Sequence, residues 1–160
     1  MPSPYINLSK NDEWYTPKYI VDYFGKFDYD PATTKEKAEE FNIPFYDTIE
    51  TDGLTKNWDS FNNIWINPPF TKKKEFIQKA VETYNKTKAN IYIIIPVSYL
   101  TTKQFYEIVP SAILYLPNGR ISFERENNIS TPALGTIIIK LSDEWSIKLI
   151  NLTKIKHTIQ

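Results

Sequence analysis

The chain has 160 residues, 41% of them hydrophobic and 24% charged, an ordinary composition for a globular protein that suits one domain over residues 1–160. Its formal net charge is zero, which disfavours a strongly basic nucleic-acid-binding domain but leaves room for a local basic patch. Cysteine is absent and the single histidine is His157, so disulfides, a thiolate nucleophile and a metal cluster of these residues are excluded.

No apolar run is long enough to span a membrane, and the N-terminal residues lack the apolar core of a signal peptide. We therefore expect a cytoplasmic protein with no membrane partner. We expect no metal in its site.

Helix and strand signals alternate from the N-terminus onward. Residues 1–12 are polar and contain proline, so we expect a loose arm there. In the helix that follows, Thr16 can act as the cap, Pro17 suits the first helical position and Gly25 ends the helix. A short strand then ends at Asp30.

The middle of the chain continues this alternation. A turn and a short polar helix are predicted over residues 31–41, while residues 43–58 fit a short strand that is followed by either a loop or one helical turn. Residues 63–66 are predicted as a buried strand and residues 72–86 as an amphipathic helix. The apolar run 91–97 is typical of an interior strand in a parallel sheet.

The last third adds a helix over residues 101–109 with Thr101 as its cap, and the mildly basic tail 148–160 is interpreted as a closing strand. Further strands are predicted at residues 112–116, 136–141 and 145–150. The alternation predicts an α/β fold with an open, mixed but mostly parallel sheet and helices on both faces.

Ligands of such sheets bind outside the carboxyl ends of the strands, near the point where the strand order reverses. The polar residues that close the predicted strands are therefore the candidates for a site. They are Asp30, Asp52, Asn67 and Ser98.

The segment Asn67-Pro68-Pro69-Phe70 has a chemistry of its own. The prolines lack N–H donors, so backbone carbonyls before and within the turn are left to accept hydrogen bonds together with the Asn67 side chain. Two converging acceptors suit a flat group that bears an NH₂, whose conjugated lone pair they would free for attack. The Phe70 ring can stack on the face of a base. Taken alone, two prolines after an apolar strand also fit a plain turn.

The order of motifs along the chain resembles the phage-type family of DNA N6-adenine methyltransferases, whose members carry an Asn-Pro-Pro-aromatic motif. The segments that carry the resemblance are EWYTP (13–17), DYDPAT (28–33), DGLTKNW (52–58), WINPPF (65–70), IIIPVSYLTTKQFYEIV (93–109), NGRISF (118–123) and TPALGTIIIK (131–140). Together they span about residues 12–141, in the order of the family.

The resemblance implies a small Rossmann-like methyltransferase domain that methylates N6 of adenine in double-stranded DNA with S-adenosylmethionine as cofactor, on a base flipped out of the duplex. The implied catalytic residues are Asn67, Pro68, Pro69 and Phe70. The implied cofactor-binding residues are Trp14, Thr16, Pro17, Asp30, Pro31, Ala32, Asp52, Gly53 and Asn67. The implied DNA-binding residues are Lys72, Lys73, Lys74 and Arg120. The acidic residue for the cofactor ribose stays open among Glu39, Glu40 and Asp47.

Each of these residue types also has a purely structural interpretation. Thr16 suits a helix cap, and Asp30 and Asp52 each suit a turn. A run of lysines is usually a solvated helix turn, although a helix N-terminus is a poor place for cations. The chain lacks the Gly-x-Gly loop of the broader methyltransferase class, since none of its 4 glycines falls in the loop after Asp30.

The chain leaves little room for a separate target-recognition domain. We therefore expect little or only short sequence specificity, or a homodimer or partner that grips the DNA. The alternatives are a catalytically inactive module that binds nucleic acid or a partner, a subunit of a larger phage complex, and methylation of RNA adenine. The resemblance implies that the gene is carried by a phage or prophage.

Overall fold

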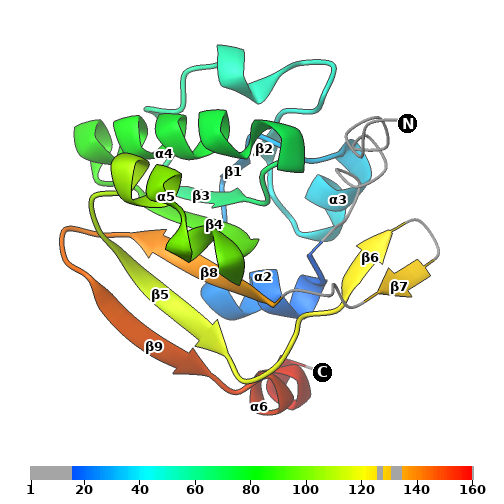
Figure 1. The fold of residues 1–160 in the computed structure, drawn as a ribbon. Coiled ribbons are helices and arrows are strands. Elements are labelled where there is room, and N and C mark those ends of the chain that lie inside the picture. Colours follow the sequence, from blue (N-terminus) through cyan, green and yellow to red (C-terminus); the bar gives the residue numbers. More distant parts are fainter. Residues whose placement is uncertain (1–15, 126–127, 131–134, 160) are drawn as a thin grey trace, which may run out of the picture.

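The computed structural model describes residues 16–125, 128–130 and 135–159 (Figure 1). Within them, one sheet of seven strands has the order β2-β1-β3-β4-β8-β5-β9. The strands are β1 (Tyr29–Asp30), β2 (Phe45–Tyr46), β3 (Asn63–Ile66), β4 (Asn90–Pro96), β5 (Ala112–Pro117), β8 (Thr136–Leu141) and β9 (Ser146–Ile150). A separate two-stranded ribbon, β6 (Phe123–Arg125) with β7 (Asn128–Ser130), was not predicted from the sequence.

The sheet is mixed, as predicted. Strand β1 pairs in parallel with β2 on one side and β3 on the other, and β3 pairs in parallel with β4. Strand β8 then runs antiparallel between β4 and β5, and β9 lies parallel to β5 at the edge. Because the chain leaves β1 for one neighbour and returns to the other, the strand order reverses at β1, and the carboxyl ends of β1 and β3 flank this switch point.

Helices cover both faces of the sheet (Figure 1). They are α2 (Lys18–Phe24), α3 (Lys35–Glu40), α4 (Lys73–Thr87), α5 (Lys103–Ile108) and α6 (Leu152–Ile159). Three short 3₁₀ turns add to them: η1 (Gly53–Thr55), η2 (Phe70–Lys72) and η3 (Val97–Thr101). Among the described residues, no helix has the length and apolar character needed to cross a bilayer.

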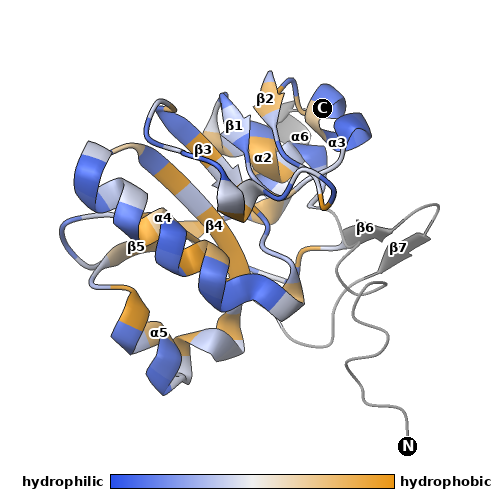
Figure 2. Cartoon of the chain, turned by 90° about the horizontal axis from the view of Figure 1, so that it is seen from above, coloured by the Kyte–Doolittle hydropathy of each residue, from blue (hydrophilic) through white to orange (hydrophobic). Residues whose placement is uncertain are grey.

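Alternation along β4 divides the core between the two faces. Ile91, Ile93 and Ile95 pack with residues of α4 and α5, whereas Ile94 packs on the opposite face with residues of α2 and α6. A strand buried on both sides needs a continuous apolar run, which is why residues 91–97 were recognisable from the sequence. Figure 2 shows hydrophobic residues along β3 and β4 and hydrophilic residues on the outer side of α4.

Two predicted helix caps are wrong by one residue. Pro17 takes the cap position of α2 with an extended backbone, so Thr16 lies one residue too early to cap it. Thr102, not Thr101, caps α5, and its hydroxyl accepts a hydrogen bond from the N–H of Phe105 at 3.2 Å. The tail is also more than a closing strand, because α6 follows β9. The parallel strands, the switch point and the two helical layers define a Rossmann-like α/β fold.

Candidate active site

The polar residues that close the parallel strands meet at one edge of the sheet. Asp30 is the last residue of β1, Asn67 directly follows β3, and Ser98 lies in η3 just after β4. Because β1, β3 and β4 are parallel neighbours, these three positions share the carboxyl edge, as the sequence predicted. Asp52 lies after β2, directly before η1.

The loops that carry Asp30 and Gly53 are pressed against each other. A Cβ added to Gly53 would lie 2.1 Å from the carbonyl oxygen of Pro31, so only glycine fits here. The indole N–H of Trp58 donates to the Gly53 carbonyl at 2.9 Å and fixes this loop from the core side. Asp52 adopts the left-handed region, with φ at 54°, and its carboxylate accepts from the N–H of Leu54. Two of the predicted cofactor segments are thus one unit of structure.

Asp30 is a buried carboxyl group, with 3% of its surface exposed. Burial raises its pKa to about 7, while the N–H of Ala32, which donates to Oδ1 at 2.9 Å, acts in the opposite direction. A carboxyl group that titrates near neutral pH at the end of a strand is typical of functional sites.

Of the three acidic candidates for the ribose, Asp47 is the one that lies at the end of the second strand. It directly follows β2, and its N–H donates to the carbonyl of Asp30 at 3.0 Å. Its carboxylate accepts a 2.6 Å hydrogen bond from the buried hydroxyl of Tyr29. Burial, and secondarily this carboxylate, raises the pKa of Tyr29 far above its ordinary value. Glu39 and Glu40 instead lie exposed on α3.

Thr16 has a buried hydroxyl without a hydrogen-bond partner in the described part of the chain, and its exposed fraction is 2%. A buried polar group left unpaired is costly, so this hydroxyl indicates a ligand contact better than it indicates a cap. Pro17 beside it is also buried. Helix α2 leads into β1, and it begins on the side toward which β3 points (Figure 1). Trp14 lies outside the described residues.

The Asn67-Pro68-Pro69-Phe70 segment forms the turn between β3 and η2. Pro68 is buried, while the Phe70 ring is 51% exposed. The carbonyl of Pro69 accepts a hydrogen bond from the N–H of Lys72 at 3.0 Å. The prediction that all backbone carbonyls of this turn are left to accept from a ligand is therefore wrong for Pro69. The cause is η2 itself, whose first hydrogen bond this is.

The three lysines after this turn do not form a uniform group. Lys72 and Lys74 are exposed. Lys73 is half-buried, and its ammonium lies 4.2 Å from the centroid of the Tyr99 ring and 5.0 Å from that of Phe70. Burial lowers the pKa of Lys73. Tyr99 was missed by the sequence analysis, although an aromatic residue just after the neighbouring parallel strand was a usable signal.

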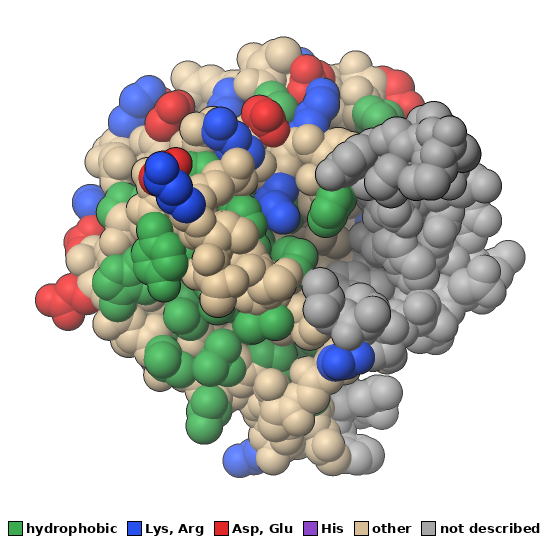
Figure 3. All heavy atoms as spheres, in the orientation of Figure 1, with side chains coloured by type: hydrophobic (Ala, Val, Ile, Leu, Met, Phe, Trp, Pro, Cys, Tyr) green, Lys and Arg blue, Asp and Glu red, His purple; other side chains and the backbone are tan. Residues whose placement is uncertain are grey.

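Arg120 is exposed and follows the carboxyl end of β5. It therefore lies on the same edge of the sheet as the lysines, but β8 separates β5 from β4. On the face shown in Figure 3, basic and acidic side chains are interspersed above the sheet, and apolar side chains gather lower on the same face. No group of three or more His, Cys, Asp and Glu side chains in the described ranges is arranged to hold a metal ion.

The fold is of the Rossmann-like class, whose members bind nucleotide cofactors at this edge of the sheet. The model of the family described as DNA N-6-adenine-methyltransferase (Dam) matches residues 5–151, and the chain belongs to this family. The family confirms the predicted resemblance and supports S-adenosylmethionine as the cofactor.

Two known proteins are similar to this chain, one in sequence and one in structure. A DNA N-6-adenine-methyltransferase of Escherichia phage T1 is 33% identical over 75 residues, which are 44% of this chain and 30% of that protein. The match thus spans less than a third of the relative's length, and its source is in agreement with the expected phage origin. A solved structure from Listeria monocytogenes, described as a class I S-adenosylmethionine-dependent methyltransferase, overlaps with 92% of this chain and 70% of its own, with a TM-score of 0.47 and 11% identity.

Proposed function

We propose that this protein transfers a methyl group from S-adenosylmethionine to N6 of adenine in DNA. The observation that carries the proposal is the position of the Asn67–Phe70 turn, which directly follows β3, beside the Asp30 loop at the end of the adjacent strand β1. A base held at the first and a cofactor held at the second would meet at the switch point of the sheet.

The residues around the Asp30 loop fit S-adenosylmethionine. The buried hydroxyl of Thr16, which has no hydrogen-bond partner within the described ranges, suits the carboxylate of the methionine part. The buried carboxyl of Asp30 suits its ammonium group, and Asp47 at the end of β2 suits the ribose hydroxyls. Asp52 suits the amino group of the cofactor's adenine. When bound, the cofactor supplies an electrophilic methyl group on a sulfonium that leaves as a neutral thioether.

The Asn67–Phe70 turn fits the amine that is methylated. The side-chain carbonyl of Asn67 and the backbone carbonyl of Pro68 accept hydrogen bonds from the two N–H groups of adenine N6. These bonds draw the nitrogen toward tetrahedral geometry and free its lone pair for in-line attack on the methyl group. The methylated nitrogen then loses one of its protons to solvent, which gives neutral N6-methyladenine. The half-exposed ring of Phe70 stacks on the base, which must leave the duplex to reach this turn.

The DNA backbone is contacted by the exposed cations of the same edge, Lys72, Lys74 and Arg120. With few cations and a net charge of zero, binding is weak, and we propose little or only short sequence specificity. Location in the cytoplasm of a bacterial host and a homodimer stay predictions. Residues 1–160 are proposed to act as one domain.

Transfer of a labelled methyl group from S-adenosylmethionine to unmethylated DNA tests the proposal, with the product digested to nucleosides and analysed by mass spectrometry. We expect N6-methyldeoxyadenosine from the wild type and at least a hundredfold less (about 3 kcal/mol or more of transition-state stabilisation) from Asn67→Ala. Asn90→Ala is the matched control, because Asn90 begins β4 at the opposite edge of the sheet. Its activity should equal that of the wild type.

The same experiment separates the alternatives. Methylated adenosine from RNA, with none from DNA, would show that the substrate is RNA and not DNA. A folded wild type that transfers no methyl group to either, and binds no S-adenosylmethionine in calorimetry, would favour the inactive binding module.

A further inference from the structure

Lys73 connects two aromatic rings from two neighbouring strand ends. Its side chain starts at the first residue of α4, and its ammonium lies over the rings of Phe70, after β3, and Tyr99, after β4. Both distances, 5.0 and 4.2 Å, lie within the reach of cation–π attraction. Lys73 thus joins the turn proposed to hold the base to the loop after the next strand.

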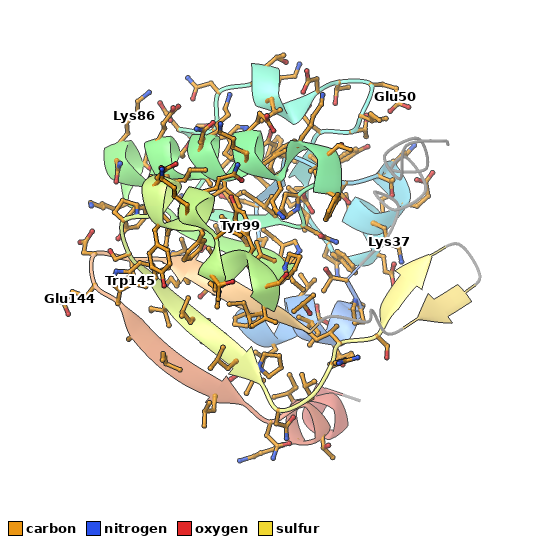
Figure 4. The ribbon with its side chains drawn as sticks, in the orientation of Figure 1. Lys37, Glu50, Lys86, Tyr99, Glu144 and Trp145 are labelled. Carbon is orange, nitrogen blue, oxygen red and sulfur yellow. The ribbon has the colours of Figure 1, made fainter. Side chains whose placement is uncertain are left out.

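The two rings differ in how firmly they are held. Tyr99 is buried, its hydroxyl donates to the side-chain oxygen of Gln104 at 2.6 Å, and its ring meets Phe105 edge to face. Figure 4 shows Tyr99 among the side chains between the sheet and helices α4 and α5. Phe70 has no such enclosure, since half of its surface is exposed. Tyr99 and Lys73 therefore form the fixed side of this contact, and Phe70 is the part that needs holding.

The position of Lys73 has a cost that the rings offset. The N-terminus of a helix disfavours a cation, and the half-buried ammonium has lost part of its hydration. A lysine that only bound phosphate would gain by turning outward, as Lys72 and Lys74 do. The ring contacts provide an electrostatic reason for Lys73 to lie inward.

We propose that Lys73 is a positioning residue for the methyl transfer: it holds one face of the Phe70 ring against the Tyr99 side of the site, so that the other face is presented to the flipped adenine. This inference rests on the proposed function. It separates Lys73 from Lys72 and Lys74, whose exposed ammonium groups are left for DNA phosphates.

The test compares Lys73→Met and Lys73→Arg with Lys74→Met, a neighbour on α4 that loses the same charge from an exposed position. For Lys73→Met we expect kcat to fall by about 2- to 30-fold, the range that cation–π contacts correspond to, with the salt dependence of DNA binding unchanged. Lys73→Arg keeps a cation over the rings and should recover most of kcat. Lys74→Met removes a proposed phosphate contact and should lower the magnitude of the slope of log K against log salt by about 0.9, a change that Lys73→Met should not show.

A second readout needs neither DNA nor cofactor. In the protein with carbon-13-labelled lysine, the ε-methylene protons of Lys73 should resonate upfield of those of Lys74, because they lie over an aromatic ring. Lys73→Met assigns the signal, and Tyr99→Phe, which keeps the ring, should leave it in place.

The results decide between the two roles. A lower salt slope with unchanged kcat in Lys73→Met, or ε-methylene protons of Lys73 at the position of an exposed lysine, would overturn the inference. If the wild type transfers no methyl group to DNA, the proposed function fails, and the proton shifts then report by themselves whether Lys73 holds the ring.

Discussion

A Cβ added to Gly53 would lie 2.1 Å from the carbonyl oxygen of Pro31. These two residues come from the loops after β2 and β1, and their contact joins both sides of the proposed cofactor site. The Asp30 loop has no Gly-x-Gly sequence. The glycine that allows close backbone contact in this region is Gly53, which belongs to the loop after β2 and packs against Pro31.

Gly53→Ala should therefore damage folding and cofactor binding together. The added methyl group meets backbone, not a flexible side chain, so the loops must separate, at a cost of about 1–3 kcal/mol. Urea denaturation and calorimetry with S-adenosylmethionine measure the two effects. Gly119→Ala is the control, because its Cβ would meet only a side-chain carbon of Leu152 at 3.9 Å. Equal stability of the two variants would contradict the close approach.

Thr16→Val should separate cofactor binding from stability. The Thr16 hydroxyl is buried and has no hydrogen-bond partner among the described residues, so replacing it by a methyl group should leave the free energy of unfolding unchanged or higher. Affinity for S-adenosylmethionine should fall by about 10- to 150-fold, the range that one hydrogen bond to a charged group corresponds to. Calorimetry of folded protein measures it.

The comparison for Thr16→Val is Thr34→Ala, because the Thr34 hydroxyl caps α3 by accepting from the N–H of Lys37. That variant should lose about 1 kcal/mol of stability and keep its cofactor affinity. If Thr16→Val loses stability while its affinity for S-adenosylmethionine is unchanged, the role of Thr16 is structural.

Asp30→Asn should remove a pH dependence of stability. The pKa of Asp30 is raised to about 7 by burial, so the folded state holds this proton more tightly than the unfolded state. The resulting stability is complete below about pH 4 and is lost as the pH rises through 7. From pH 5 to pH 8 the wild type should lose about 2–3 kcal/mol through this group.

Denaturation at the two pH values measures this loss, which Asp30→Asn should abolish. Asp59→Asn, which alters an exposed carboxylate, should retain it. A wild type whose stability does not fall over this range would show that Asp30 is ionised without cost.

Phe70→Ala should impair catalysis and leave folding intact. The ring is 51% exposed, so little core is lost, whereas base stacking on an aromatic ring is worth about 1–3 kcal/mol. We expect kcat/KM for DNA to fall by about 5- to 150-fold, measured by methyl transfer. Tyr106→Ala, which removes an exposed ring on α5, should have no effect. Equal activity of Phe70→Ala and wild type would exclude a stacking role.

The sequence predicted most of the fold because its signals are local. The buried strand at residues 63–66 and the apolar run of β4 follow from unbroken β-branched and aromatic residues. Gly25 ends α2 as predicted, with a positive φ of 122° that glycine tolerates. The predicted cap Thr101 is wrong because Thr102 offers the same hydroxyl one position later. The predicted cap Thr16 is wrong because α2 begins one residue later, with Pro17 at the cap position and no side-chain cap. Only the backbone decides such one-residue shifts.

The sequence by itself determined the alternation of helix and strand, and with it which polar residues stand at strand ends, because side-chain periodicity and turn chemistry are properties of neighbouring residues. The sequence also determined the family, because the order of motifs along the chain can be recognised without knowing which residues are in contact. Only the tertiary structure decided that Gly53 touches Pro31, that Asp47 is the acid at the end of β2, and that Lys73 lies between Phe70 and Tyr99. These contacts join residues of separate strands and loops, and their geometry is set by how the sheet packs, which no local pattern encodes.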